Sequence, residues 1–306
     1  MAPSSNDHQH LYGVALCAAS AVGFGLMAIF AKEAYAAGVG VGTLLVVRFV
    51  LAASAFWAVV VARRPAWPPR RVVLAGLGMG AILYTAQSGL YFTALTRIDA
   101  SLAALLLYTF PALVFLGALA LGRERPERRR LAALTLAGAG AILVLGGSGS
   151  GDADGLGIAL GLGAALAYAT YILVADGVVG RIDPFLLSAL IATGAAGSFS
   201  GYSAVSGDLA LGFEPIGWLW IAGVVAFSTV LALSLFLIGL PKVGPSTASI
   251  VSTIEPLVTV GLAMAILGER LGPVQALGGT LVLAAVVLLA RRAAPPRVGV
   301  AARVMA

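Results

Sequence analysis

The chain has 306 residues, of which 60% are hydrophobic and only 10% are charged, and its mean hydropathy is +1.01. In soluble domains about a quarter of all residues are charged. This composition therefore excludes a soluble globular protein and indicates a polytopic membrane protein. The single cysteine excludes an intrachain disulfide and a cysteine-based metal centre. Both histidines, His8 and His10, precede the first apolar segment. We therefore expect no histidine-dependent catalysis, no metal site and no cofactor.

Ten apolar segments follow one another along the chain, separated by charged or Gly- and Pro-rich breaks. As helices, they have about the length that crosses roughly 30 Å of hydrocarbon. We place them at 11–31, 42–62, 72–95, 99–121, 131–147, 155–175, 184–206, 216–239, 245–267 and 273–290. The predicted fold class is an all-α membrane protein with ten transmembrane helices. No basic region precedes the first segment, which we interpret as a retained helix and not a signal peptide.

A polar stretch, GGSGSGDADG at 146–155, divides the ten segments into two halves of five. The predicted organisation is a first repeat over 1–147, a flexible linker over 148–154, a second repeat over 155–291 and a tail over 292–306.

The basic residues predict the orientation, because cytoplasmic loops are enriched in Lys and Arg. With the N-terminus inside, the cytoplasmic side carries fifteen basic residues: Arg63, Arg64, Arg70, Arg71, Arg123, Arg125, Arg128, Arg129, Arg130, Arg181, Lys242, Arg291, Arg292, Arg297 and Arg303. The other side carries three, Lys32, Arg97 and Arg270. Both termini are therefore predicted to be cytoplasmic. The net charge of +6 is explained by these topology signals beside anionic lipid, and we expect no nucleic-acid partner.

An internal repeat relates the two halves. Residues 90–144 align without a gap on 235–289, with thirteen identities in 55 positions. That count is modest for a chain so rich in Ala and Leu, but Pro111 falls on Pro256 and Glu124 falls on Glu269. Because the offset spans five helices, an odd number, the two copies have opposite orientations. Inverted repeats are typical of secondary transporters, in which two related halves expose a midplane site to alternate sides.

Three motifs recur in a characteristic order: the paired "AL…A(S/T)A…P…GER" repeats, "AIFAKEA" at 28–34 and "VVRFVLA" at 46–52. With these motifs, the chain resembles the EamA family of the drug/metabolite transporter superfamily over nearly its whole length. The first copy departs slightly, with "GRER" where a plain "GE" is usual. The resemblance implies two inverted five-helix halves around a cavity lined mainly by helices 1, 3, 4, 6, 8 and 9. It also implies transport across the bacterial inner membrane, most often export of amino acids or other small metabolites.

We therefore expect a secondary transporter that exports amino acids or related small polar metabolites by alternating access, with proton coupling as a further hypothesis. A multidrug or cationic-compound exporter and facilitative uptake are alternatives, and an intramembrane enzyme is disfavoured. The expected partners are a small-molecule substrate, the lipid bilayer and protons, for a monomer or homodimer.

Glu255 is the most informative side chain, because a charge deep in the bilayer costs roughly 2.5–3.5 kcal/mol. One interpretation makes it a partner for a substrate ammonium or a proton acceptor, and the other a structural acid. Its repeat counterpart is Phe110, so the repeat itself requires no charge there. Ser252, three residues earlier, is its expected polar neighbour. Pro111 and Pro256 are expected to interrupt helices and to deprive the carbonyls four residues earlier of their donors.

Other ionisable residues are assigned to gating or structure. Arg48 could attract a substrate carboxylate, but we favour a structural or gating role, in which it snorkels to the near interface or pairs with Glu33 or a helix C-terminus. Lys32 is expected to end the first helix and to form an external ion pair, with Glu33, Asp99 or Glu269 as candidate partners. Glu124 and Glu269 are expected to cap or clamp the following helix.

Polar and aromatic side chains complete the expected cavity. Tyr84, Gln87, Ser88 and Tyr91 are spaced i, i+3, i+4 and i+7, which predicts one polar face on the third helix. The other expected lining residues are Phe24, Tyr108, Tyr168 and Tyr171.

Overall fold

The computed structural model describes residues 5–123, 127–146 and 154–290, and within these ranges all the regular structure is helical. Seven helices are long and apolar enough to cross a membrane. Three shorter apolar helices, Leu131–Gly146, Ile250–Ile266 and Pro273–Leu289, accompany them. The prediction of an all-α membrane protein with ten apolar helices is confirmed.

Several of the ten spans are divided into shorter helices. The first half contains α1 (Ser5–Gly25), α2 (Met27–Ala36), α3 (Val41–Arg63), α4 (Arg70–Gly78), the π-helix η1 (Met79–Tyr84), α5 (Thr85–Ala94), α6 (Ala100–Leu107), α7 (Phe110–Ala120) and α8 (Arg128–Gly146). The second half contains α9 (Gly155–Ala175), the short 3₁₀ turn η2 (Val179–Arg181), α10 (Pro184–Ser206), α11 (Ile216–Val225), the π-helix η3 (Ala226–Leu231), α12 (Ala232–Ser252), α13 (Ile254–Ile266) and α14 (Pro273–Ala290).

The interruptions follow the internal repeat. The fourth span breaks at Tyr108–Thr109, between α6 and α7, and the ninth breaks at Thr253, between α12 and α13. These breaks are 145 residues apart, which is the offset of the sequence repeat. The third and eighth spans each contain a π-helix, and in each a threonine donates to the carbonyl five residues earlier, Thr85 to Gly80 and Thr229 to Val224. π-Helical turns within α-helices are often found at functional sites.

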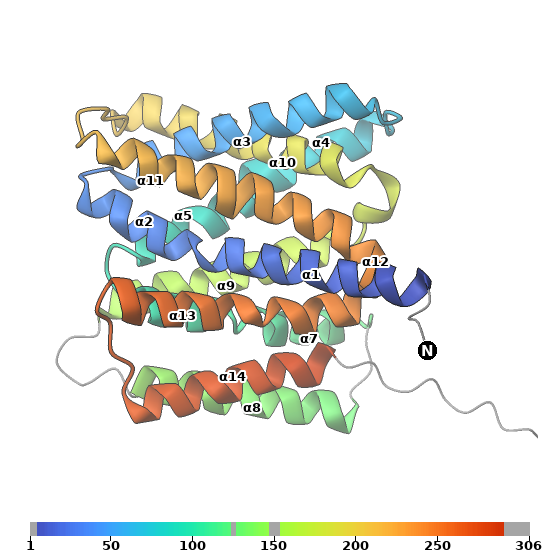
Figure 1. Cartoon of the computed structure of the whole chain (residues 1–306), viewed down its shortest axis with the longest axis vertical. Helices are drawn as coiled ribbons and strands as arrows, with labels where there is room; N and C mark the ends of the chain where they lie inside the picture. Colours follow the sequence, from blue (N-terminus) through green and yellow to red (C-terminus); the bar gives the residue numbers. More distant parts are fainter. Residues whose placement is uncertain (1–4, 124–126, 147–153, 291–306) are drawn as a thin grey trace, which may run out of the picture.

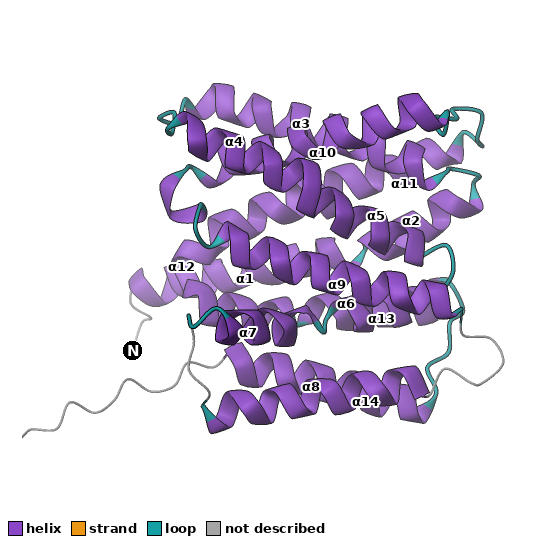
Figure 2. Ribbon diagram, turned by 180° about the vertical axis from the view of Figure 1, so that it is seen from behind, coloured by secondary structure: helices purple, strands orange, loops and turns teal. Residues whose placement is uncertain are grey.

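The helices stack in layers, with α3 and α10 at one end and α8 and α14 at the other (Figure 1). Figure 2 shows the same order from behind. Close helix approach depends on glycine: a side chain at Gly140 would meet the Gly278 carbonyl, and one at Gly278 would meet the Gly140 carbonyl. The α8–α14 pair is therefore held by backbone contact, as small residues permit in membranes.

The helix ends lie on two faces. We call one the basic face; it contains the α3–α4 loop at 64–69, the end of α7, the α9–α10 loop and the start of α1 (Figure 1). The opposite face contains the loops at 37–40, 95–99, 207–215 and 267–272.

The first span extends beyond the predicted end at residue 31. After a break at Leu26, α2 continues to Ala36, because the AKEAYAA stretch consists mostly of good helix formers. The helix ends before Gly38, whose φ of 84° suits glycine. Lys32 therefore lies inside α2, and the prediction that it ends the helix is wrong.

Candidate functional site

A central cavity of about 570 Å³ lies between the two halves of the molecule, within the usual range for small-molecule sites. Its wall combines apolar and aromatic side chains with a few polar ones. The polar residues on its wall are Arg48, Tyr84, Gln87, Tyr91, Tyr108, Tyr168, Ser252, Glu255 and Thr259.

A second cavity of about 720 Å³ adjoins the first and reaches the basic face. The two share wall residues, among them Phe24, Tyr84 and Tyr168. The second cavity continues to Asp176 in the α9–α10 loop and to Pro241 near the end of the eighth span. The cavity system is therefore open towards the basic face.

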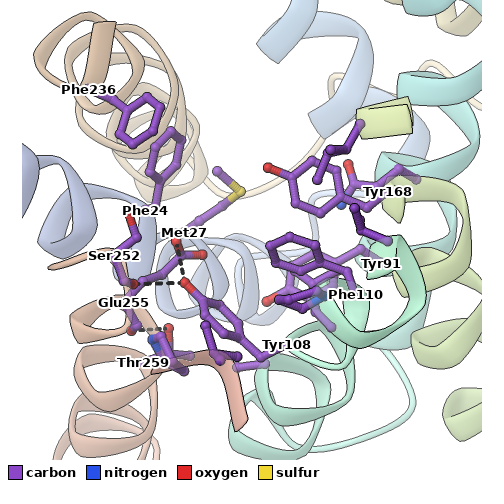
Figure 3. Close-up of a pocket in the computed structure, with 18 of the residues that line it drawn as sticks. Phe24, Met27, Tyr91, Tyr108, Phe110, Tyr168, Phe236, Ser252, Glu255 and Thr259 are labelled. Carbon is purple, nitrogen blue, oxygen red and sulfur yellow. Dashed lines mark hydrogen bonds between the residues drawn. The ribbon is translucent and has the colours of Figure 1, made fainter. Parts of the chain in front are cut away.

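Glu255 lies on the wall of the central cavity, next to Tyr108 from the other half of the chain (Figure 3). The Tyr108 hydroxyl oxygen lies 2.9 Å from Glu255 Oε2 and 2.9 Å from the Ser252 carbonyl oxygen. Since a hydroxyl has one proton to donate, both contacts are hydrogen bonds at once only when Glu255 is protonated and donates to Tyr108. Tyr108 then donates to Ser252.

Tyr108 also explains how the interrupted ninth span is stabilised. Both prolines lie in the first turn of a new helix, where the missing N–H is tolerated: Pro111 follows the first residue of α7, and Pro256 is the third residue of α13. As expected, Pro256 has no N–H to give the Ser252 carbonyl its usual backbone donor, and the Tyr108 hydroxyl contacts that carbonyl instead.

The break in the first span meets the ninth span beside this cluster. Thr259 follows Glu255 by one turn, and its hydroxyl donates to the Gly25 carbonyl at 2.9 Å. A side chain at Gly25 would collide with the Glu255 carbonyl, so the two backbones are in close contact. Sequence reasoning missed Thr259, although its position four residues after Glu255 places it on the same helical face.

Three of the four residues predicted on the third helix line the cavity, namely Tyr84, Gln87 and Tyr91. The fourth, Ser88, is buried at 1% exposure and donates to Gln87 Oε1 at 3.1 Å. The prediction that Ser88 lines the cavity is wrong. Ser88 is one residue beyond Gln87 in α5, about 100° further around the helix, so its side chain lies off the face that lines the cavity.

Aromatic rings form the wall facing Glu255 (Figure 3). Phe110, the repeat counterpart of Glu255, packs edge-on against Tyr168, with centroids 4.6 Å apart. Tyr168 stacks on Tyr171, which lines the second cavity, while Phe24 lines both. Phe110, Met27 and Phe236 also line the central cavity, and the sequence did not distinguish them from ordinary apolar packing residues.

Arg48 is buried at 2% exposure and lines the central cavity, so the prediction that it snorkels is wrong. Its Nε donates to Thr229 Oγ1 at 3.0 Å, where the π-helix η3 presents the hydroxyl. The guanidinium carbon lies 4.8 Å from the centroid of Phe49 and 5.0 Å from that of Phe92. Arg48 forms no ion pair with Glu33 or with another acid of the described chain.

The opposite face is closed by contacts between spans. Lys32 Nζ donates to the Ile98 carbonyl at 2.8 Å and forms no ion pair with the described Glu33, Asp99 or Glu269, contrary to prediction. The Glu269 carboxylate accepts from the backbone N–H groups of Ala100 and Ser101 at 2.7 and 2.9 Å.

This second contact joins the end of the ninth span to the N-terminus of α6 in the other half, so the prediction that Glu269 caps the following helix, α14, is wrong. A carboxylate there also interacts favourably with the helix dipole. Burial raises the pKa of the adjacent Asp99, the negative charge of Glu269 raises it further, and Lys32 opposes the shift. Glu124, the predicted counterpart of Glu269, lies outside the described residues.

An inverted arrangement of five-span halves around a central cavity, closed on one face and open on the other, defines a membrane transporter fold. The model of the EamA-like transporter family matches residues 11–146 and 155–291. The chain belongs to this family.

Two known proteins extend the comparison. The chain is 26% identical over 265 residues to the "Uncharacterized transporter YcbK" of Bacillus subtilis (strain 168), covering 83% of this chain and 85% of that protein. A solved structure, titled "Crystal structure of protein", superposes with a TM-score of 0.62 at 17% identity, covering 90% of this chain and 95% of the other. The second likeness concerns the fold alone.

Proposed function

We propose that this transporter exports amino acids or related small polar metabolites by alternating access, with the basic face towards the cytoplasm of a bacterium. The cavity system that opens to that face, with Glu255 and Tyr108 on its wall, is the observation that carries the proposal. The excess of basic residues on the same face supports the orientation.

The proposed proton coupling is supported by the hydrogen bonds of the Tyr108 hydroxyl. When Glu255 is protonated, Tyr108 is free to donate to Ser252 and stabilises the break between α12 and α13. When Glu255 loses its proton, the carboxylate is the stronger acceptor and draws the Tyr108 proton away from Ser252. The protonation state of Glu255 thereby changes the hydrogen bonding at a helix junction, which is where a hinge absorbs conformational change.

Transport in proteoliposomes tests this proposal. The full chain is reconstituted, loaded with the twenty protein amino acids as a pool, and followed by mass spectrometry with and without a pH gradient. We expect the gradient to accelerate the movement of at least one pool member. Glu255→Gln should lose this acceleration, and Glu214→Gln, on an exposed loop of the opposite face, should retain it.

Two results would contradict the proposal. Equal rates with and without the gradient in the wild-type protein rule out proton coupling. No movement of any amino acid, in vesicles that hold folded protein, rules out the substrate class.

A further inference from the structure

The guanidinium of Arg48 is buried, and no carboxylate of the described residues lies within ion-pair distance of it. Arg63 pairs with Asp183, Arg97 with Asp154 and Arg123 with Asp176, but Arg48 forms no ion pair with a described residue. Glu255 lines the same cavity but is not within ion-pair distance of it. Leaving a buried charge unpaired is costly, so a buried cation usually has an anionic partner.

The surroundings of Arg48 hold the guanidinium in place without neutralising it. Thr229 accepts from Nε, and the rings of Phe49 and Phe92 lie within cation–π distance. A guanidinium has five N–H donors in a planar fork, and the hydroxyl of Thr229 uses only the one on Nε. Tyr84, also on the cavity wall, is a further polar neighbour. This arrangement preorganises a cation on the cavity wall.

We propose that Arg48 is the specificity-determining residue of the cavity and binds a carboxylate of the transported molecule. The inference rests on the proposed function and adds the chemical group that the substrate must carry. A carboxylate matches the two-pronged geometry of a guanidinium. A doubly charged phosphate fits less well, because among the described residues Arg48 alone brings a positive charge to the central cavity and Glu255 adds negative charge to the same wall.

The rest of the cavity agrees with a molecule that is anionic at one end. Phe24, Met27, Phe110 and Phe236 offer an apolar surface to its body. Glu255 and Tyr108 offer acceptors for an ammonium group elsewhere on the wall. A purely cationic compound would leave Arg48 unpaired, so the inference argues against a cation exporter.

The test compares three matched pools in proteoliposomes that contain the full chain: the amino acids, the amines formed by removing their carboxylates, and the acids formed by removing their amino groups. We expect the wild-type protein to move amino acids at least tenfold faster than the matching amines. Arg48→Gln should lower amino-acid movement by at least tenfold without lowering that of amines. Arg97→Gln, an exposed arginine beside Asp154, is the matched control and should behave as wild type.

A second variant keeps the test valid if Arg48→Gln does not fold. Thr229→Val retains the cation and removes the hydroxyl that orients it. We expect it to reduce the preference for amino acids over amines severalfold.

Each other outcome is informative. If the wild-type protein moves amines as fast as the matching amino acids, the assignment of Arg48 is overturned, but the protein still acts as a transporter. An Arg48→Gln protein with unchanged preference also overturns it. Movement of the deaminated acids alone supports Arg48 and contradicts the amino-acid class of the proposed function. Movement of none of the three pools contradicts the proposed function itself, and with it the inference.

Discussion

Replacing Tyr108 by Phe removes one hydroxyl that contacts two oxygen atoms of the ninth span, the Ser252 carbonyl oxygen and Glu255 Oε2. Tyr108 is 6% exposed, so its ring stays packed and no large cavity forms. A buried polar group that loses its partner costs about 1–3 kcal/mol. Glu255 is partly exposed to the cavity, where water can take over, so the loss arises mainly at the Ser252 carbonyl.

We therefore expect Tyr108→Phe to lower the free energy of unfolding by about 1–3 kcal/mol. The assay is reversible unfolding in mixed detergent–SDS micelles, followed by circular dichroism. Tyr168→Phe is the matched control, because this ring lines the same cavity and the described structure gives its hydroxyl no hydrogen bond. It should change stability by less than about 0.5 kcal/mol. Equal losses in the two variants would refute the assignment of Tyr108 to the Ser252 carbonyl.

Three further predictions concern closure of the opposite face and helix contact. Glu269→Gln loses one of the two charge-assisted hydrogen bonds to α6, worth about 1.5–3 kcal/mol. Labelling of the loops at 37–40 and 267–272 by an impermeant reagent should therefore increase. Unchanged labelling would exclude a role of Glu269 in closing this face. The pKa of Asp99 is raised, so protonated Asp99 stabilises the closed face, and this stabilisation is lost as the pH rises through that raised pKa. Asp99→Asn should therefore make loop labelling less dependent on pH. An unaltered pH profile in this variant would contradict the prediction. Gly194→Leu should destabilise the protein by about 1–3 kcal/mol or more because its side chain would overlap the Leu77 carbonyl, whereas Gly197→Ala faces open space and should not; equal unfolding midpoints would refute the contact.

The fold was largely predictable because hydrophobic periodicity and length determine where membrane helices lie. The segments at 155–175, 184–206 and 273–290 agree with α9, α10 and α14 to the residue. The break at Leu26 and the two π-helices were not predicted, since no proline marks them and each depends on contacts with other spans. Thr259 reaching Gly25 is one such contact.

The types of residue in the candidate site were predictable from the sequence, but the contacts between those residues were less so. Glu255 and Ser252 were chosen for their polarity within an apolar segment, and both line the cavity. Their link to Tyr108 requires the fourth and ninth spans to meet, which no local pattern reports. Arg48 was expected to snorkel because snorkelling is the general way to keep a membrane arginine hydrated. A hydroxyl from the other half of the chain and two aromatic rings hold it inside instead.

Alternating access is the central claim, and the accessibility of one introduced thiol tests it most directly. Val114 lines both cavities, and the native Cys17 is fully buried, so the unmodified protein serves as the background control. In Val114→Cys, a membrane-impermeant thiol reagent should react from the basic face in the absence of a gradient, and from the opposite face only during transport. Reaction from the opposite face alone, or from both faces regardless of transport, would contradict the account.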